Sequence, residues 1–311
     1  IHNANNYTLS NTYGMPGLNK KIVDSYLKSD GSRFTDVPGY STMEFYQEMQ
    51  GRDPRLTQTV RGPGYTRIGQ TAKLSPDFSC STTGYQLTKW VTDVSQDGYN
   101  KSYNDIILFR AAEVYLNFAE AKAELGTLTQ EDINLSVKRL RDRVGMSNLI
   151  LDDANKNPDP YLSDAKTGYP NVTGANKGVI LEIRRERTVE LLMENLRYWD
   201  IMRWKEGKRF EKPFTGLYFP GTGSYDLNND GVNDVCIWSG SKPATSAPAV
   251  YELNKEIFLS GGDSGYIIIH TDYARSWNEE RDYLYPVPTD DRVLTQGAIT
   301  QNPGWNDGLN F

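Results

Sequence analysis

Residues 104–126 read NDIILFRAAEVYLNFAEAKAELG and carry the strongest helical pattern in the chain. Apolar side chains recur every three or four positions on more than one stripe, formed by Phe109, Ala112, Leu116, Ala119 and Ala123 and by Val114, Phe118, Ala121 and Leu125. A helix that is apolar around most of its girth is normally buried, and its alanines let neighbouring helices approach closely. A second helix is expected from about 130 to 143, after a turn at Gly126. Residues 104–144 therefore predict a helical hairpin of the tetratricopeptide type.

A long buried helix is expected over residues 179–206, and Gly207 ends it. Charges of alternating sign share one face of this helix at Arg187, Glu190, Glu194 and Arg197. An arginine beside a carboxyl group lowers its pKa, which makes these glutamates poor general acids for glycoside cleavage. We therefore expect a structural ion network that also includes Glu113 and Glu120 of the preceding helix.

The segments around these helices are irregular in composition. Residues 1–103 and 211–311 are rich in Gly, Pro, Asn and Tyr, and residues 151–178 form a polar linker. The sequence thus predicts a mainly α fold, in which tetratricopeptide-like hairpins are combined with long irregular loops and short strands. Because a helical repeat needs stacked neighbours to bury its faces, we expect this chain to be part of something larger.

Composition excludes several classes of function. The 311 residues carry 34 basic and 40 acidic side chains, a net charge of −6, so we expect no nucleic-acid partner. With two His and two Cys, no Cys/His zinc site of usual spacing is possible, and Cys80 and Cys236 are left unpaired. The longest apolar runs are far shorter than the ~20 residues of a membrane-spanning helix. Tyrosine is unusually abundant, at 20 residues, in a chain whose mean hydropathy is −0.62.

Several ordered motifs in this chain resemble the SusD/RagB family of outer-membrane lipoproteins. They include RDPRL at 52–56, TGY at 83–85, the helix of 104–126, the pattern of charged residues and Trp204 over 180–205, YPVP at 285–288 and QNPGW at 301–305. Together these motifs span almost the whole chain. Residues 1–311 are identified as a SusD/RagB-like C-terminal region that lacks the N-terminal helical part of the family.

The resemblance implies a function without catalysis. Such a protein binds glycans at the extracellular face of the outer membrane and delivers oligosaccharides to a SusC-like TonB-dependent transporter in polysaccharide utilisation. Contact with the membrane would be through a lipid anchor that is absent from this chain. Alternatives are a peptide-binding RagB-like protein, a tetratricopeptide interaction scaffold and a secreted glycoside hydrolase.

The loop at residues 226–234 reads DLNNDGVND and suggests calcium. Its oxygen ligands would be the side chains of Asp226, Asn228, Asp230 and Asp234 and the carbonyl of Val232, with Gly231 at the tight turn. The bidentate Glu expected at the twelfth position is replaced by Ile237. The predicted calcium ion would be structural, and the alternative is a turn in which these side chains bind their own backbone.

The resemblance implies that glycan contacts come from aromatic rings on irregular loops outside the helices, and the flat apolar face of a sugar can stack on such rings. The candidates are Tyr65, Trp90, Tyr99 and Trp238. Tyr85, Trp204, Trp277 and Trp305 lie inside the family motifs and are expected in the core. The sequence Gly262-Asp263-Ser264-Gly265 resembles a protease nucleophile loop, but without a distant His base it is expected to be a turn.

Overall fold

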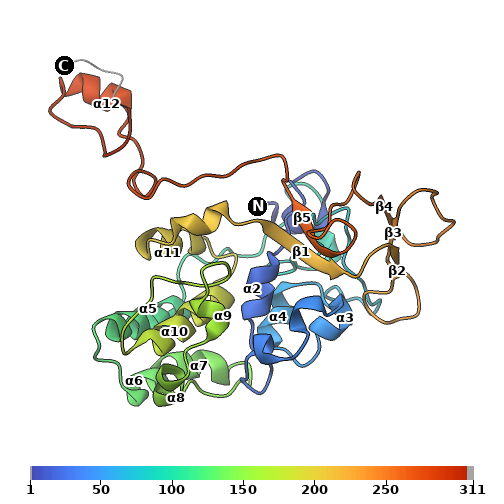
Figure 1. Ribbon diagram of the computed structural model, residues 1–311, viewed down its shortest axis with the longest axis horizontal. Coiled ribbons are helices and arrows are strands. Elements are labelled where there is room, and N and C mark those ends of the chain that lie inside the picture. The colour runs from blue at the N-terminus through green and yellow to red at the C-terminus, as the bar shows by residue number, and fades with distance from the viewer. Residues whose placement is uncertain (1, 307–311) are drawn as a thin grey trace.

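The computed structural model describes residues 2–306, so residue 1 and residues 307–311 of the expected 1–311 region lie outside the described residues. Helices α5 to α11 gather in one part of the molecule, α2 to α4 lie beside them, and the short strands lie beyond (Figure 1). The predicted fold class, mainly α with short strands and long loops, is confirmed.

Apart from two longer helices, the helices and strands within residues 2–306 are short. The α-helices are α1 (Ala4–Leu9), α2 (Lys20–Ser25), α3 (Phe45–Glu48), α4 (Pro54–Thr59), α5 (Ala111–Glu124), α6 (Gln130–Leu135), α7 (Val137–Asp142), α8 (Leu151–Lys156), α9 (Pro160–Ser163), α10 (Lys177–Glu190), α11 (Arg197–Arg203) and α12 (Thr289–Leu294). The strands are β1 (Phe214–Phe219), β2 (Gly223–Tyr225), β3 (Val235–Trp238), β4 (Ala249–Glu252) and β5 (Gly265–Ile269). Short 3₁₀ turns cover Phe34–Asp36, Tyr40–Thr42, Val94–Gln96 and Gly207–Glu211.

Helix α10 is the centre of the helical part. Every residue from Gly178 to Glu190 is buried, and the helix packs against α2, α4, α5, α7 and α8. Gly178 makes the contact with α8 possible, because a Cβ at this position would lie 1.8 Å from the carbonyl oxygen of Ala154. Its apolar side chains join one core cluster with those of α5, α7, α8 and α9.

The charged side chains of α10 are paired with partners from other elements. The carboxylate of Glu186 forms ion pairs with Arg55 of α4 and Arg141 of α7, with N–O distances of 2.5 Å and 2.9 Å. Glu190 lies 2.6 Å from Arg110, which precedes α5, and 2.9 Å from Arg143, which follows α7. The predicted ion network is therefore present in part: Arg187, Glu190, Glu194 and Glu120 form ion pairs, with partners on other elements. Arg197 and Glu113 form no ion pair within residues 2–306.

The RDPRL motif explains how Arg55 reaches this network. Asp53 caps α4 by accepting a hydrogen bond from the backbone N–H of Arg55, and Pro54 occupies the first helical turn, where no N–H is needed. Asp53 also pairs with the Arg55 guanidinium at 2.7 Å. The motif thus starts a helix and orients a buried arginine toward Glu186 and Glu190.

The prediction that the helix of 104–126 is buried all round is wrong. α5 begins at Ala111, and residues before it are not helical, because Arg110 adopts an extended backbone while its guanidinium pairs with Glu190 and Glu194. One stripe is buried against α10, α6 and α7, made of Ala112, Leu116, Ala119, Glu120 and Ala123. The opposite side of α5 is open, since Val114 is 64% and Leu125, at the end of the helix, 76% exposed, and Phe109, which precedes the helix, is 85% exposed.

Two predicted helices are each divided in the structure. The single helix expected over 179–206 is α10 followed by α11, and the chain breaks between them where Met193 and Asn195 have positive φ angles of 61°. Lys89 and Trp90 hold this break by donating to the carbonyls of Leu192 and Met193. The second helix of the predicted 104–144 hairpin is α6 followed by α7, and it breaks at Ser136.

The strands form two small sheets next to a second core cluster. β1 and β5 pair antiparallel, with Phe214 opposite Ile269 and Phe219 opposite Gly265. In the other sheet β3 lies between β2, antiparallel, and β4, parallel. Apolar residues of α2, α3 and α4 pack with these strands, and Tyr85 lies in this cluster with no exposed surface.

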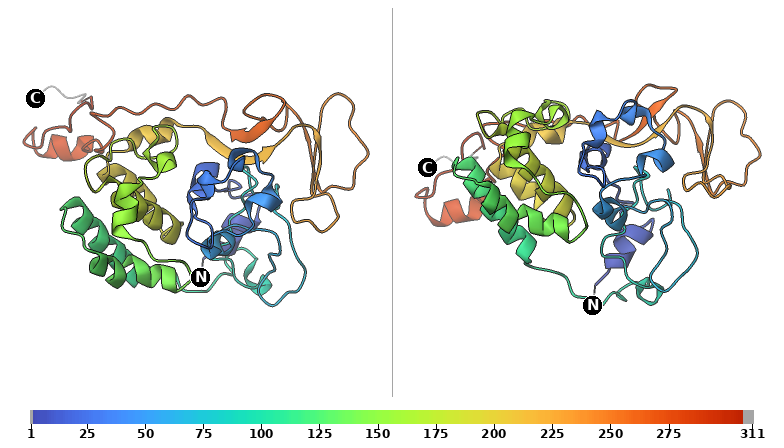
Figure 2. Two further views of the ribbon diagram at one scale, coloured as in Figure 1. Left: turned by 60° about the horizontal axis from the view of Figure 1, so that its bottom comes forward. Right: turned by 90° about the horizontal axis from the view of Figure 1, so that it is seen from below.

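The C-terminal segment leaves β5 and crosses the molecule to α12, as both views of Figure 2 show. It is attached at Gly207, where the ring of Trp277 lies so close that it would overlap any Cβ, and at Tyr198, whose hydroxyl is 2.8 Å from that of Tyr285. Trp277 and Trp305 are half-buried, whereas Trp204 is buried as expected. Among the helices of residues 2–306, none combines the length and the apolar character that a membrane span requires.

The ion pairs of Glu186 predict a dependence of stability on pH. Burial alone would raise the pKa of Glu186, but the charges of Arg55 and Arg141 outweigh burial and lower the pKa to about 2. Since the unfolded pKa is higher, about 4.3, this stabilisation is present above pH 5 and is lost as the pH falls toward 2. We expect Glu186→Gln to lower the free energy of unfolding at pH 7 by about 3–5 kcal/mol, because two buried arginines lose their partner.

Urea unfolding between pH 3 and 7 measures this effect. The matched control is Glu131→Gln, since Glu131 is an exposed acid on α6 without an ion pair among residues 2–306. If the two variants were equally stable at pH 7, the buried ion pairs of Glu186 would make no net contribution to the free energy of unfolding.

Candidate functional site

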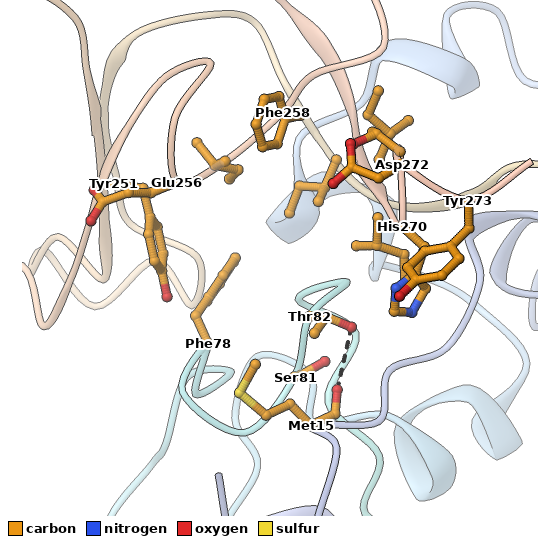
Figure 3. A pocket seen from close by; sticks show the side chains of 15 residues that line it. Met15, Phe78, Ser81, Thr82, Tyr251, Glu256, Phe258, His270, Asp272 and Tyr273 are labelled. Atoms are coloured by element: carbon orange, nitrogen blue, oxygen red, sulfur yellow. Dashed lines mark hydrogen bonds between the residues drawn. The ribbon is translucent and has the colours of Figure 1, made fainter.

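A cleft of about 380 Å³ opens where β5 ends and three loops meet (Figure 3). Its lining comes from five parts of the chain: Met15, then Phe78, Ser81 and Thr82, then Tyr251 of β4, the turn at 256–258 and residues 267–273. These segments are far apart in sequence and are brought together by the β1–β5 pair and by β4. Such concave, largely apolar sites with a few polar groups are the usual places for small ligands.

One wall of the cleft is aromatic. The rings of Phe78 and Tyr251 lie 6.1 Å apart in a tilted arrangement, and Phe78 is buried, which fixes its position against Phe219. Burial is the main cause that raises the pKa of Tyr251, and the nearby carboxylates of Asp77 and Glu256 raise it further. The phenol therefore stays neutral at physiological pH and can donate a hydrogen bond.

The opposite wall is formed by the turn after β5. His270 and Tyr273 face the aromatic wall across the cleft in Figure 3, and their rings lie 6.3 Å apart, edge to face. Tyr273 is 73% exposed, and a backbone hydrogen bond from its N–H to the carbonyl of His270 closes the turn. Asp272 lies on the same turn. This wall offers one exposed ring together with imidazole and carboxylate hydrogen-bonding groups.

The floor carries polar groups and backbone strain. Thr82 holds the carbonyl of Met15 through its N–H at 3.0 Å and its hydroxyl at 3.3 Å. The hydroxyl of Ser81 is buried without a hydrogen-bond partner among the described residues. Met15 and His270 both have positive φ angles, 47° and 55°, which non-glycine residues rarely adopt. Backbone in sparsely populated φ/ψ regions is found at ligand sites among other places.

This arrangement is suited to binding a polyhydroxylated ligand. The rings of Phe78, Tyr251 and Tyr273 can pack against an apolar face, and the polar groups of Ser81 and Asp272 can accept or donate hydrogen bonds to hydroxyls. The walls belong to separate loops, so the spacing between the rings depends on the packing of β4 and β5.

None of the four aromatic residues predicted from the sequence lines this cleft. Tyr65 is half-buried with its ring 5.7 Å from the Arg61 guanidinium, and Tyr99 is 69% exposed on a loop. Trp90 lines a separate cavity of about 420 Å³ beside Arg110 and Glu190, and Trp238 is half-buried at the end of β3. Their role in glycan binding stays a prediction.

The structure identifies other aromatic candidates that sequence reasoning missed. Tyr251, Phe258 and Tyr273 line the cleft, and no motif singled them out. One available signal was the position of Tyr273, which follows the apolar strand Ile267-Ile268-Ile269 after a short polar turn. Spacing could not have joined Tyr251 to Phe78, because Tyr251 lies on β4 and Phe78 on a loop far away in the sequence.

In the loop of 226–234, the side chains turn toward the backbone. Asp226 accepts hydrogen bonds from the N–H groups of Asn228, Asp230 and Gly231, and Asp230 accepts one from Val232. Asp234 is buried and accepts from the hydroxyl of Ser75 at 2.5 Å and from the N–H of Leu227. No three His, Cys, Asp or Glu side chains among residues 2–306 converge on one point for a metal ion. Calcium binding by this loop stays a prediction.

Two further features noted in the sequence have structural roles. Gly262-Asp263-Ser264-Gly265 lies in the turn that enters β5, where the N–H of Gly261 donates to the carbonyl of Ser264. Cys80 and Cys236 are both buried and free.

Comparisons with known proteins give one family and one fold. A family model described as the SusD family matches residues 2–305. A SusD-like protein from Bacteroides fragilis NCTC 9343 is similar in structure, with a TM-score of 0.58, 20% sequence identity and coverage of 98% of this chain and 50% of that chain. A SusD-like carbohydrate binding protein from the same organism has a TM-score of 0.53 and 23% identity, with coverage of 89% and 47%. This chain thus spans about half the length of both structures. The search of curated proteins found no match.

Calorimetric titration of the metal-free protein with calcium tests the prediction for residues 226–234. We expect one ion per chain and a higher melting temperature, because the ion relieves repulsion among closely spaced carboxylates. Asp226→Asn combined with Asp230→Asn should abolish both effects, while Asp290→Asn on α12 should preserve them. The absence of binding heat and of any thermal shift would identify the loop as an Asx-rich turn.

Proposed function

The chain belongs to the SusD family, and we propose that it captures glycans in the cleft between Tyr251 and Tyr273. The family consists of non-catalytic, cell-surface proteins that bind carbohydrate, so the chain is not assigned an enzymatic role. One of the similar structures is described as a carbohydrate binding protein. The chemistry of the cleft supports the same class of ligand for this chain.

The observation that carries the proposal is the combination of aromatic rings and polar hydrogen-bonding groups in the lining of one cleft. Tyr251 and Phe78 present ring surface on one side, and Tyr273 presents an exposed ring on the other. His270 and Asp272 on the turn after β5 offer imidazole and carboxylate groups for hydrogen bonds to ligand hydroxyls. A sugar combines an apolar C–H face with a rim of hydroxyls and is complementary to both features.

The biological setting follows from the family as a proposal. The bound oligosaccharide would be passed at the extracellular face of the outer membrane to a SusC-like TonB-dependent transporter. Binding without turnover suits this role, because the ligand must leave the cleft unchanged.

Titration of the protein with a panel of neutral oligosaccharides, with affinity gels as a second method, tests the proposal. We expect Tyr273→Ala to weaken binding of the best ligand about tenfold, which corresponds to about 1.4 kcal/mol. Tyr251→Ala should have at least the same effect. Because Tyr273 is 73% exposed, its replacement should leave folding intact, and a loss of affinity in that variant reports on the cleft itself.

Tyr99→Ala is the matched control, since Tyr99 is 69% exposed on a loop outside the cleft. Loss of binding in this control, with Tyr273→Ala unaffected, would place the glycan at the residues predicted from sequence. A response to peptides and none to any glycan would overturn the carbohydrate assignment in favour of a RagB-like ligand.

A further inference from the structure

A second cavity, of about 190 Å³, lies between α2, the loop after α9, α11 and the start of β1. Five cationic side chains line it, and Arg275 adjoins it by donating to the carbonyl of Lys212 and lying over the ring of Phe214. The five are Lys21, Lys166, Arg197, Arg209 and Lys212. No acidic side chain of the described chain lines the cavity. This concentration of positive charge is unexpected in a chain of net charge −6.

Few carboxylates lie near these cations: Glu211 interacts electrostatically with Lys212, and Asp164 accepts a hydrogen bond from the backbone N–H of Lys166. Within residues 2–306, none of them forms an ion pair, whereas the arginines around α10 nearly all do. Arg197 donates to the hydroxyls of Thr188 and Tyr169, and Arg209 donates to the carbonyls of Gly168 and Thr167. The ammonium groups of the three lysines have no protein acceptor in the described chain. Glu206 interacts electrostatically with Arg209, but it is buried and forms an ion pair with Arg184.

The electrostatic consequences appear on two neighbouring groups. Burial and then the charges of Arg209, Lys212 and Arg275 lower the pKa of Lys21 to about 8. Burial would raise the pKa of Tyr169, but Arg197 and Arg209 outweigh it and lower that pKa. Both shifts indicate positive charge that the protein leaves uncompensated, and a bound anion would compensate it.

The volume of the cavity and its hydrogen-bond donors limit the class of anion that could bind there. The cavity volume is about six times the liquid volume of one water molecule, enough for a small oxyanion and the atoms that carry it. Ile22, Phe210 and Phe214 supply apolar walls beside the charges. Lysine ammoniums are compact point charges that can approach a tetrahedral oxyanion from several directions, and an arginine guanidinium can add a bidentate contact to a phosphate or sulfate.

We propose that this cavity is a binding site for a tetrahedral oxyanion, presented as a sulfate ester or a phosphate group of a ligand. The site is separate from the glycan cleft, with which it shares no lining residue. Lys21 and Lys212 would hold the oxyanion, and Arg209 would supply further charge from the side. The inference stands whether or not the cleft binds neutral glycans.

The test is calorimetric titration of the full chain with inorganic sulfate, inorganic phosphate, galactose 6-sulfate and galactose, in sodium chloride at constant ionic strength. We expect binding of the oxyanions and none of galactose. Lys21→Met combined with Lys212→Met should weaken oxyanion binding at least tenfold. Without oxyanion, this variant should melt at the same temperature as the wild type or higher, since mutual repulsion is removed, so a loss of binding cannot be attributed to unfolding.

Lys73→Met combined with Lys242→Met is the matched control, because both lysines are exposed, unpaired within the described chain and distant in sequence from the cavity. Tighter binding of galactose 6-sulfate than of inorganic sulfate would support a sulfated saccharide as the source, and preference for phosphate would support a phosphorylated one. Nuclear magnetic resonance of Lys21 should show its pKa rising when the oxyanion binds. Absence of oxyanion binding, or equal affinity in both double variants, would overturn the proposal.

Discussion

The rest of the helical fold depends on the need to neutralise charges that α10 carries into the core. Glu182, Glu186 and Glu190 are buried on this helix, and a buried carboxylate without a partner costs several kcal/mol. Their arginine partners come from α4, from α7 and from the residues that flank α5 and α7. Each of these segments must approach α10 in one orientation, so the ion pairs fix the relative placement of elements that are distant in sequence.

Other parts of the molecule contrast with the ion network around α10, because their charged side chains form no ion pair, or their apolar side chains stay uncovered, in the described chain. Around α10 nearly every buried arginine has a carboxylate, whereas the cations between α2, α11 and β1 form no ion pair in the described chain. The outer side of α5 has apolar residues that no described element covers. The cleft beside β5 lies outside the ion network, on loops whose positions depend on two short sheets.

Periodicity and motifs predicted a large part of the fold, and their failures have physical causes. The helical regions, the mainly α class and the ion network were visible because helical spacing and charge alternation are local properties. The break between α10 and α11 was not visible in the sequence, because Lys89 and Trp90 stabilise it from another loop. Prediction of the site was poorer. Tyr65, Trp90, Tyr99 and Trp238 were selected for their loop context, which does not reveal which rings share a cleft.

The sequence by itself determined the family and the helical segments, because these follow from ordered motifs and local spacing. Tertiary structure alone decided which arginine neutralises which glutamate, which side of α5 is buried and which aromatic rings face one another. Tyr251 and Tyr273 meet across a cleft because β4 and β5 pack on a common core, and the lysines at 21 and 212 converge because α2 packs against β1. Such contacts join residues that are far apart along the chain, so no local pattern records them.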